Sequence, residues 1–184
     1  MLDTRELGRR PGSQREVSFS AEAPAGLGID ILGVPEGSTV DLDLRLEAVM
    51  EGVLVTGTAA ADLEGECARC LEPITDSIVV DLQELFVYDD PDHDDRGARE
   101  DDEDDDVSRL VDDLVDLEPL LRDAVVLALP YQPLCSDDCP GLCAECGARL
   151  ADDPDHRHDT PVDPRWAVLG DVVVADPEQP STEA

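Results

Sequence analysis

Hydrophobic and polar residues alternate over much of the first half of this chain. The clearest stretch is residues 40–48, where apolar side chains occupy every second position and Asp, Arg or Glu separate them. The same period of two runs through residues 15–23, 53–63 and 78–86. Because successive side chains of a strand point to opposite faces, this pattern predicts strands with one buried face.

Turn-forming residues separate these strands. Pro35-Glu-Gly37 precedes the second run, Glu51-Gly52 precedes the third, and residues 27–31 form another short alternating stretch. Strands of this period joined by short turns are typical of an antiparallel meander. The sequence therefore predicts an α+β, mainly β fold whose core is an antiparallel meander sheet.

One segment has helical rather than strand periodicity. Residues 114–117 are expected to form a short strand or the entry to this helix. We expect Asp116 to be the N-cap, Pro119 to lie in the first turn and Pro130 to end the helix. This main helix should cover the apolar face of the sheet. Its apolar positions are Leu117, Leu120, Leu121, Ala124, Val125 and Ala128.

Charge narrows the range of partners. The 184 residues include 46 acidic and 13 basic side chains, all of the latter Arg, so the net charge is −33. Twelve acidic residues fall within residues 89–106, which predicts a disordered, solvated loop. The electrostatic field of this large negative charge repels nucleic acid phosphates and favours basic protein partners. The alternative is that acidic, Lys-free usage reflects the composition of the source proteome.

We expect no targeting signal at the start of the chain. The N-terminus lacks an apolar stretch of signal-peptide length, and no run approaches the roughly 20 residues of a membrane span. We therefore expect a cytoplasmic protein, in which thiols stay reduced. The expected division is a polar, basic segment 1–14, a domain 15–134, a Cys-rich knuckle with a short helix 135–170, and a flexible tail 171–184.

The six cysteines are the strongest candidates for chemistry. Cys67 and Cys70 form a Cys-x-x-Cys pair, which the meander places at a hairpin tip as in a zinc knuckle. The other four lie within a dozen residues. We expect these four thiolates to close a structural zinc site, which leaves no open coordination position for catalysis. They are Cys135, Cys139, Cys143 and Cys146.

Other ligand pairings remain open. One shared site would combine Cys67 and Cys70 with Cys143 and Cys146, as in a zinc ribbon. Another arrangement would use His156 or His158, although Asp-His-Arg-His-Asp is more typical of an exposed loop. Six cysteines and two histidines are enough for two closed sites.

A thiol redox enzyme is an alternative reading of Cys67 and Cys70. Arg69 would lower the pKa of a neighbouring thiol. Thioredoxin-type pairs, however, lie at a helix N-terminus, and this pair lies in an antiparallel hairpin. The chain carries no phosphate-binding Gly loop and no His-Glu-x-x-His or Gly-x-Ser-x-Gly motif. We therefore predict no catalytic residues.

An ordered set of short motifs resembles a known family. The motifs are Cys67-Ala-Arg-Cys70-Leu-Glu-Pro73, Asp116-Leu-Glu-Pro-Leu-Leu-Arg-Asp, Leu127-Ala-Leu-Pro130, Cys143-x-x-Cys146-Gly147, Leu2-Asp-Thr-Arg-Glu-Leu-Gly-Arg-Arg-Pro-Gly12 and Asp163-Pro-Arg-Trp-Ala-Val-Leu169. Together they resemble the YceD family, also described as large ribosomal RNA subunit accumulation proteins. The start of the chain and residues 163–169 resemble its actinobacterial members.

The resemblance implies a non-enzymatic ribosome-biogenesis factor that supports synthesis, processing or stability of 23S ribosomal RNA. With this charge, we expect it to act through a basic ribosomal protein or a large-subunit precursor, with Arg69 and Trp166 as partner-binding residues. Direct RNA contact through a local Arg patch stays open. One alternative is a zinc-stabilised acidic adaptor that sequesters a basic protein outside ribosome assembly. The other is the redox enzyme.

Overall fold

The computed structural model describes residues 1–88, 107–158 and Arg165. The chain divides into two compact units, Met1–Gly141 and Leu142–Ala184, and each is described by itself. The acidic run 89–106, the short helix expected at Asp163 and the side chain of Trp166 lie outside the described residues.

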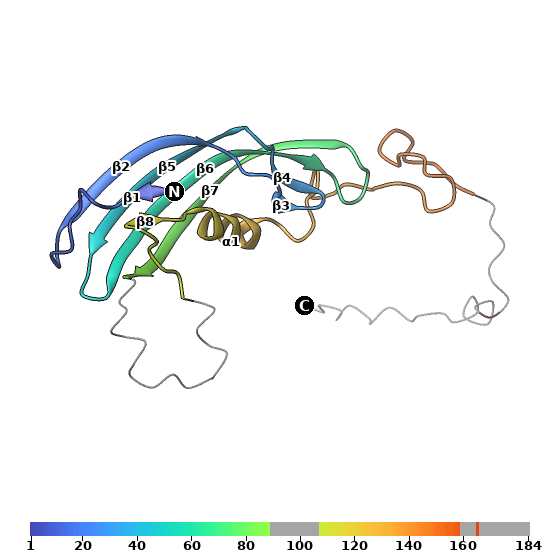
Figure 1. The fold of residues 1–184 in the computed structure, drawn as a ribbon. Helices are drawn as coiled ribbons and strands as arrows, with labels where there is room; N and C mark the ends of the chain where they lie inside the picture. The colour runs from blue at the N-terminus through green and yellow to red at the C-terminus, as the bar shows by residue number, and fades with distance from the viewer. Residues whose placement is uncertain (89–106, 159–164, 166–184) are drawn as a thin grey trace, which may run out of the picture. The chain divides into compact units, whose positions relative to one another are not determined.

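Four long strands form the body of the first unit. They are β2 (Gln14–Glu22), β5 (Thr39–Ala48), β6 (Gly52–Glu66) and β7 (Pro73–Val87). Each pairs antiparallel with the next in the order β2–β5–β6–β7, and together they form a curved sheet (Figure 1). The predicted mainly β fold with an antiparallel sheet is confirmed.

The alternating pattern places one face of the sheet in the core. Every second residue of β5 is buried, and the acidic residues between them, such as Asp41 and Asp43, are exposed. Gly57 marks a point where β5 and β6 approach closely, because a Cβ there would lie 2.1 Å from the Asp43 carbonyl oxygen. The buried apolar residues of β5, β6 and β7 are Val40, Leu42, Leu44, Leu46, Ala48, Val53, Val55, Ala59, Leu63, Val80, Leu82 and Phe86.

Two short hairpin strands replace the single alternating stretch expected over residues 27–31. Strands β3 (Leu27–Ile29) and β4 (Leu32–Val34) pair antiparallel, and β4 continues onto the far end of β6. A glycine pair permits the hairpin, because a Cβ on Gly28 would lie 2.4 Å from the Gly33 Cα. Alternation alone could not show that the chain reverses here.

The N-terminal segment is part of the fold rather than only a polar extension. Strand β1 (Leu2–Asp3) pairs antiparallel with β8 (Leu114–Val115) in a second, two-stranded sheet. The Thr4 hydroxyl donates to the Asp113 carbonyl oxygen over 2.8 Å, and Leu7 is buried in the core. These contacts join the start of the chain to the segment that leads into the helix.

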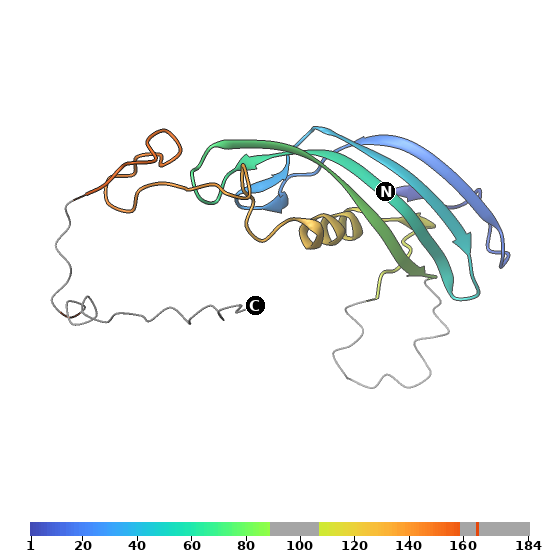
Figure 2. The same cartoon turned by 180° about the vertical axis from the view of Figure 1, so that it is seen from behind.

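Helix α1 (Glu118–Ala128) lies on the concave side of the sheet (Figures 1 and 2). Its buried residues, Leu121 and Val125, belong to the core, and the helix packs against β7 and β3, so it covers part of the apolar face. Leu117 rather than Asp116 occupies the N-cap and makes no side-chain cap. Asp116 instead accepts a 3.2 Å hydrogen bond from the Glu118 amide.

Helix α1 has 11 residues, about half of what a membrane crossing needs. No helix of the described residues is long and apolar enough to cross a membrane.

Candidate metal centres

The turn between β6 and β7 carries Cys67 and Cys70, as the meander predicted. The Cys67 amide donates to the Glu72 carbonyl over 2.8 Å, and the Leu71 amide donates back to the Cys67 carbonyl over 2.9 Å. Leu71 adopts a positive φ of 61° to close this turn. The result is a tight knuckle at the tip of the longest hairpin.

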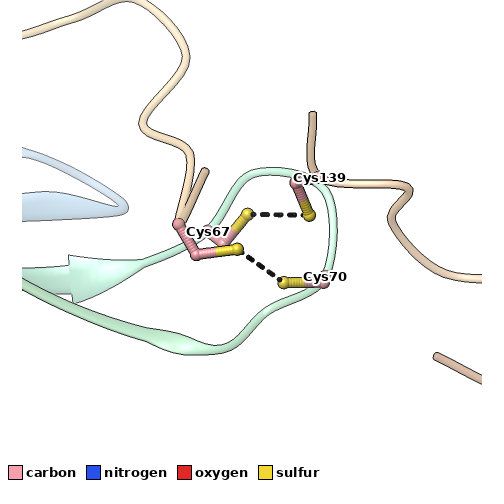
Figure 3. A group of neighbouring side chains, drawn as sticks. Cys67, Cys70 and Cys139 are labelled. Atoms are coloured by element: carbon pink, nitrogen blue, oxygen red, sulfur yellow. Dashed lines mark hydrogen bonds between the residues drawn. The ribbon is translucent and has the colours of Figure 1, made fainter. Parts of the chain in front are cut away.

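Two more cysteines reach this knuckle from the segment that follows α1. The Cys67 and Cys139 sulfurs lie 3.7 Å apart, and those of Cys70 and Cys135 lie 3.6 Å apart. All four sulfurs lie within 4.8 Å of one another. Figure 3 shows the side chains of Cys67, Cys70 and Cys139 pointing toward one another.

These distances distinguish a metal site from a disulfide. A disulfide requires sulfurs about 2 Å apart, and all six cysteines are free. Zinc–sulfur bonds of about 2.3 Å in a tetrahedron place neighbouring sulfurs about 3.8 Å apart. The measured separations of 3.6 and 3.7 Å therefore match the edges of a four-thiolate metal site.

Two hydrogen bonds hold the two halves of this cluster together. The Ala68 amide donates to the Pro133 carbonyl over 2.8 Å. The Arg69 guanidinium donates from Nη1 to the Cys139 carbonyl over 2.9 Å. Arg69, which the sequence suggested as a partner-binding residue, thus has a structural contact beside the cluster.

The thiols of Cys67 and Cys70 have opposing tendencies to ionise. Burial disfavours the Cys67 thiolate, but the backbone amides of Cys135, Arg69 and Cys70 outweigh it and lower the pKa of Cys67 to about 6. The Glu72 amide favours a Cys70 thiolate, yet burial and the neighbouring cysteine sulfurs raise the pKa of Cys70 to about 12. A divalent cation among the sulfurs would offset the repulsion between neighbouring thiolates and allow all four to ionise.

A second cluster lies within the second unit. The Cys146 sulfur lies 3.2 Å from His156 Nε2 and 3.3 Å from His158 Nε2, and the two Nε2 atoms are 2.8 Å apart. Cys143 completes a group whose ligand atoms all lie within 4.8 Å of one another. The backbone amides of Cys146 and Glu145 lower the pKa of Cys143 to about 6.

The ligand grouping differs from the main expectation. Of the four cysteines expected in one site, Cys135 and Cys139 join the hairpin knuckle, and Cys143 and Cys146 join the histidines. The physical reason is that the hairpin tip already supplies two thiolates beside Cys135 and Cys139.

The two histidines lie in a loop, as expected, with His158 exposed and His156 half-buried. Both Nε2 atoms nevertheless lie against Cys146, which adds the histidines to the candidate ligands. Their spacing was the available signal, because His-x-His after a Cys-x-x-Cys offers a second ligand pair. Trp166, the other suggested partner-binding residue, lies outside the described residues.

Comparison with known proteins identifies the family. Residues 55–172 match the family model for the large ribosomal RNA subunit accumulation protein YceD. The chain belongs to the YceD family. The match starts in β6 and extends over all eight residues of the two clusters. No solved structure matches the chain.

Relatives in the curated proteins span most of this YceD-family chain. An uncharacterised Mycobacterium tuberculosis protein, Rv2926c, is 49% identical over 91% of this chain and 78% of its own length. An uncharacterised Mycobacterium leprae protein, ML1660, is 40% identical over 98% of this chain and 81% of its own. The Bacillus subtilis protein YlbN is 27% identical over 66% of each.

Proposed function

We propose that this protein is a non-enzymatic factor in biogenesis of the large ribosomal subunit that supports accumulation of 23S ribosomal RNA. The observation that carries the proposal is the family match over residues 55–172, whose description names large ribosomal RNA subunit accumulation. Within that role, we propose that the protein binds a basic ribosomal protein or large-subunit precursor. The net charge of −33 supports a basic protein partner over direct binding of RNA phosphates.

The edge of β7 is where we place this partner. Among the described residues, β7 pairs with β6 along one edge. On its other edge, Val87 donates a hydrogen bond to the Ser108 carbonyl and accepts one from the Leu110 amide. Backbone groups of alternate residues point to the same edge of a strand. Gln83 and Leu85 therefore present their amide and carbonyl groups to this edge, where an extended peptide can add as a strand.

Acidic side chains surround that edge. A groove runs between β7 and α1 past residues Ser108 and Arg109. Its acidic lining residues are Asp81, Glu84, Asp116 and Asp123. An extended segment rich in Arg or Lys would pair its backbone with β7 and its charges with these carboxylates.

We assign the first cluster to a structural zinc ion. The residues that would hold it are Cys67, Cys70, Cys135 and Cys139. Zinc would supply a tetrahedral, redox-inert link between the hairpin tip and the segment after α1. Three of the sulfurs are buried, whereas reactive thiols occupy partly exposed sites, so the geometry favours this role over thiol redox catalysis.

The ribosomal role is tested by depleting the protein in its own host. The expected result is a fall in 23S relative to 16S ribosomal RNA and accumulation of large-subunit precursors, both restored by the wild-type gene. An unchanged 23S to 16S ratio and an unchanged subunit profile would contradict the proposal.

The partner is tested by affinity capture of the full chain at moderate salt, with proteins identified by mass spectrometry. Enrichment of basic large-subunit proteins or precursors is expected. If basic proteins unrelated to ribosomes are enriched instead, the alternative of an adaptor outside ribosome assembly gains support and the assembly role is lost.

The binding edge has its own matched variants. Asp81→Arg with Glu84→Arg should abolish capture of the same partner, whereas Glu16→Arg with Asp43→Arg makes the same charge change on exposed positions of β2 and β5 and should retain it. Gln83→Pro removes an edge amide without changing charge and should also weaken capture. Equal capture by all three variants would exclude β7 as the docking edge.

A further inference from the structure

The second Cys-x-x-Cys motif repeats the backbone geometry of the first. The Cys143 amide donates to the Ala148 carbonyl over 2.8 Å, and the Gly147 amide donates to the Cys143 carbonyl over 2.9 Å. At the hairpin tip the corresponding bonds join Cys67 with Glu72 and Leu71. Both turns place a positive φ at the residue after the second cysteine, 72° at Gly147 and 61° at Leu71. The two motifs are therefore the same knuckle in two places.

The two histidines complete a second ligand set of different composition. Their Nε2 atoms meet the Cys146 sulfur at 3.2 and 3.3 Å. The rings are nearly perpendicular, with an interplanar angle of 78° and centroids 4.7 Å apart. This arrangement points two nitrogen lone pairs from different directions toward one centre, as tetrahedral coordination requires.

Each imidazole also has a carboxylate near its Nδ1 atom. His156 Nδ1 lies 3.8 Å from Asp153, and His158 Nδ1 lies 3.5 Å from Glu145. Carboxylates beside the non-ligating nitrogen are the usual second shell of histidine metal ligands, where they fix the tautomer and orient the ring. Surface histidines that merely pair with acids have no reason to turn both Nε2 atoms toward a cysteine.

Nothing apolar accounts for the conformation of this segment. None of the described residues from 142 to 158 is buried, and both cysteines here are free thiols. A segment of this size without a core or a disulfide needs a metal to hold a defined fold. The convergence of four ligands within 4.8 Å supplies the place for one.

We propose that Cys143, Cys146, His156 and His158 form a second zinc site that folds residues 142–158 independently of the first cluster. Glu145 and Asp153 are its positioning residues. The site is closed by two thiolates and two imidazoles, so its role is structural. The chain then holds two zinc ions with different ligand sets, one in each unit.

The test is zinc content of the full-length protein, purified under reducing conditions and measured by elemental mass spectrometry. Wild type should hold two zinc equivalents. Cys146→Ser should hold one, and Cys70→Ser should also hold one. Two equivalents in Cys146→Ser would overturn the proposal, as would a single equivalent in wild type that Cys146→Ser retains. A single equivalent that only Cys146→Ser loses would support this site and remove the four-cysteine one.

A spectroscopic readout identifies the ligands without relying on loss of folding. With cobalt in place of zinc, His158→Cys should keep two metal equivalents and increase the intensity of thiolate-to-cobalt charge-transfer absorption. An unchanged spectrum in His158→Cys would contradict ligation by His158.

The positioning residues have a matched control in the same loop. Glu145→Gln and Asp153→Asn should each weaken zinc binding about 10–100-fold in competition with a chelator. Asp155→Asn should leave the affinity unchanged, because the carboxylates that lie near the imidazole Nδ1 atoms within the described residues are those of Asp153 and Glu145. If all three variants weaken zinc binding equally, the negative charge of the loop as a whole supports the affinity, and Glu145 and Asp153 are not positioning residues.

Discussion

At the scale of single residues, the two knuckles solve the same backbone problem with different side chains. Both need a residue with positive φ after the second cysteine, and the second uses Gly147 whereas the first uses Leu71. A non-glycine residue in this left-handed region is strained because its Cβ crowds the following carbonyl. Leu71 gains little in return from packing, because 59% of its surface is exposed.

Replacing Leu71 with Gly should therefore stabilise the protein. The expected gain is about 1 kcal/mol in the free energy of unfolding, measured by urea denaturation of the metal-loaded protein. Leu71→Ala is the control, since it removes the same exposed side chain but keeps the strained Cβ, and it should give no comparable gain. Destabilisation by the Gly variant would show that the turn does not hold Leu71 in this conformation.

At the scale of secondary structure elements, helix α1 is tied to the loop before β3 by one side chain. Arg122 donates to the carbonyl oxygens of Ala25 and Gly26 and pairs with Glu118 one turn earlier. Arg122 lies 96 positions after Gly26 and 97 positions after Ala25, so these bonds connect distant parts of the chain. They complement the apolar contact of Leu121 and Val125 with the core.

Arg122→Met should loosen this connection while keeping most of the apolar stem. We expect a loss of about 1 kcal/mol in unfolding free energy, the lower range for hydrogen bonds of a charged donor because the side chain is one-third exposed. Arg45→Met is the comparison, since the Arg45–Glu47 ion pair lies within β5 on its solvent-facing side and should contribute less. Equal losses would mean that the tie to the β3 loop adds nothing.

At the scale of the whole molecule, the four-cysteine cluster closes a long loop. Cys70 and Cys135 are 65 positions apart, and the segment between them contains β7, β8 and α1. A link at this point restricts the unfolded chain much as a disulfide would. The stability of the first unit should therefore depend on metal in the four-cysteine site.

Metal removal checks this dependence. Protein stripped of metal with a chelator under reducing conditions should unfold at a temperature lower by about 10 °C, and zinc should restore the midpoint. Cys146→Ser serves as the control. Because Cys146 belongs to the second unit, the unfolding midpoint of this variant, followed by the β-sheet signal, should stay near that of wild type. A midpoint that chelation leaves unchanged would show that metal does not contribute to the stability of the first unit.

Much of the fold could be predicted because its signals are local. The strands of the main sheet follow from alternation in which every second side chain must leave water, and the end of α1 follows from Pro130, which cannot continue a helix. Both Cys-x-x-Cys knuckles were visible for the same reason, since a two-residue gap fixes the direction of two sulfurs. Turns and sheet pairings with nonlocal causes, such as β1 with β8, were missed.

Residue types and spacing indicate which side chains could bind a metal, and the tertiary structure sets which of them lie close enough to share one ion. Spacing alone favoured one knot of four neighbouring cysteines. The β6–β7 hairpin instead carries Cys67 and Cys70 to Cys135 and Cys139, and the remaining pair meets His156 and His158. The physical reason is that a tetrahedral ion selects ligands by distance in space, and sheet pairing and the position of α1 set those distances for the first cluster.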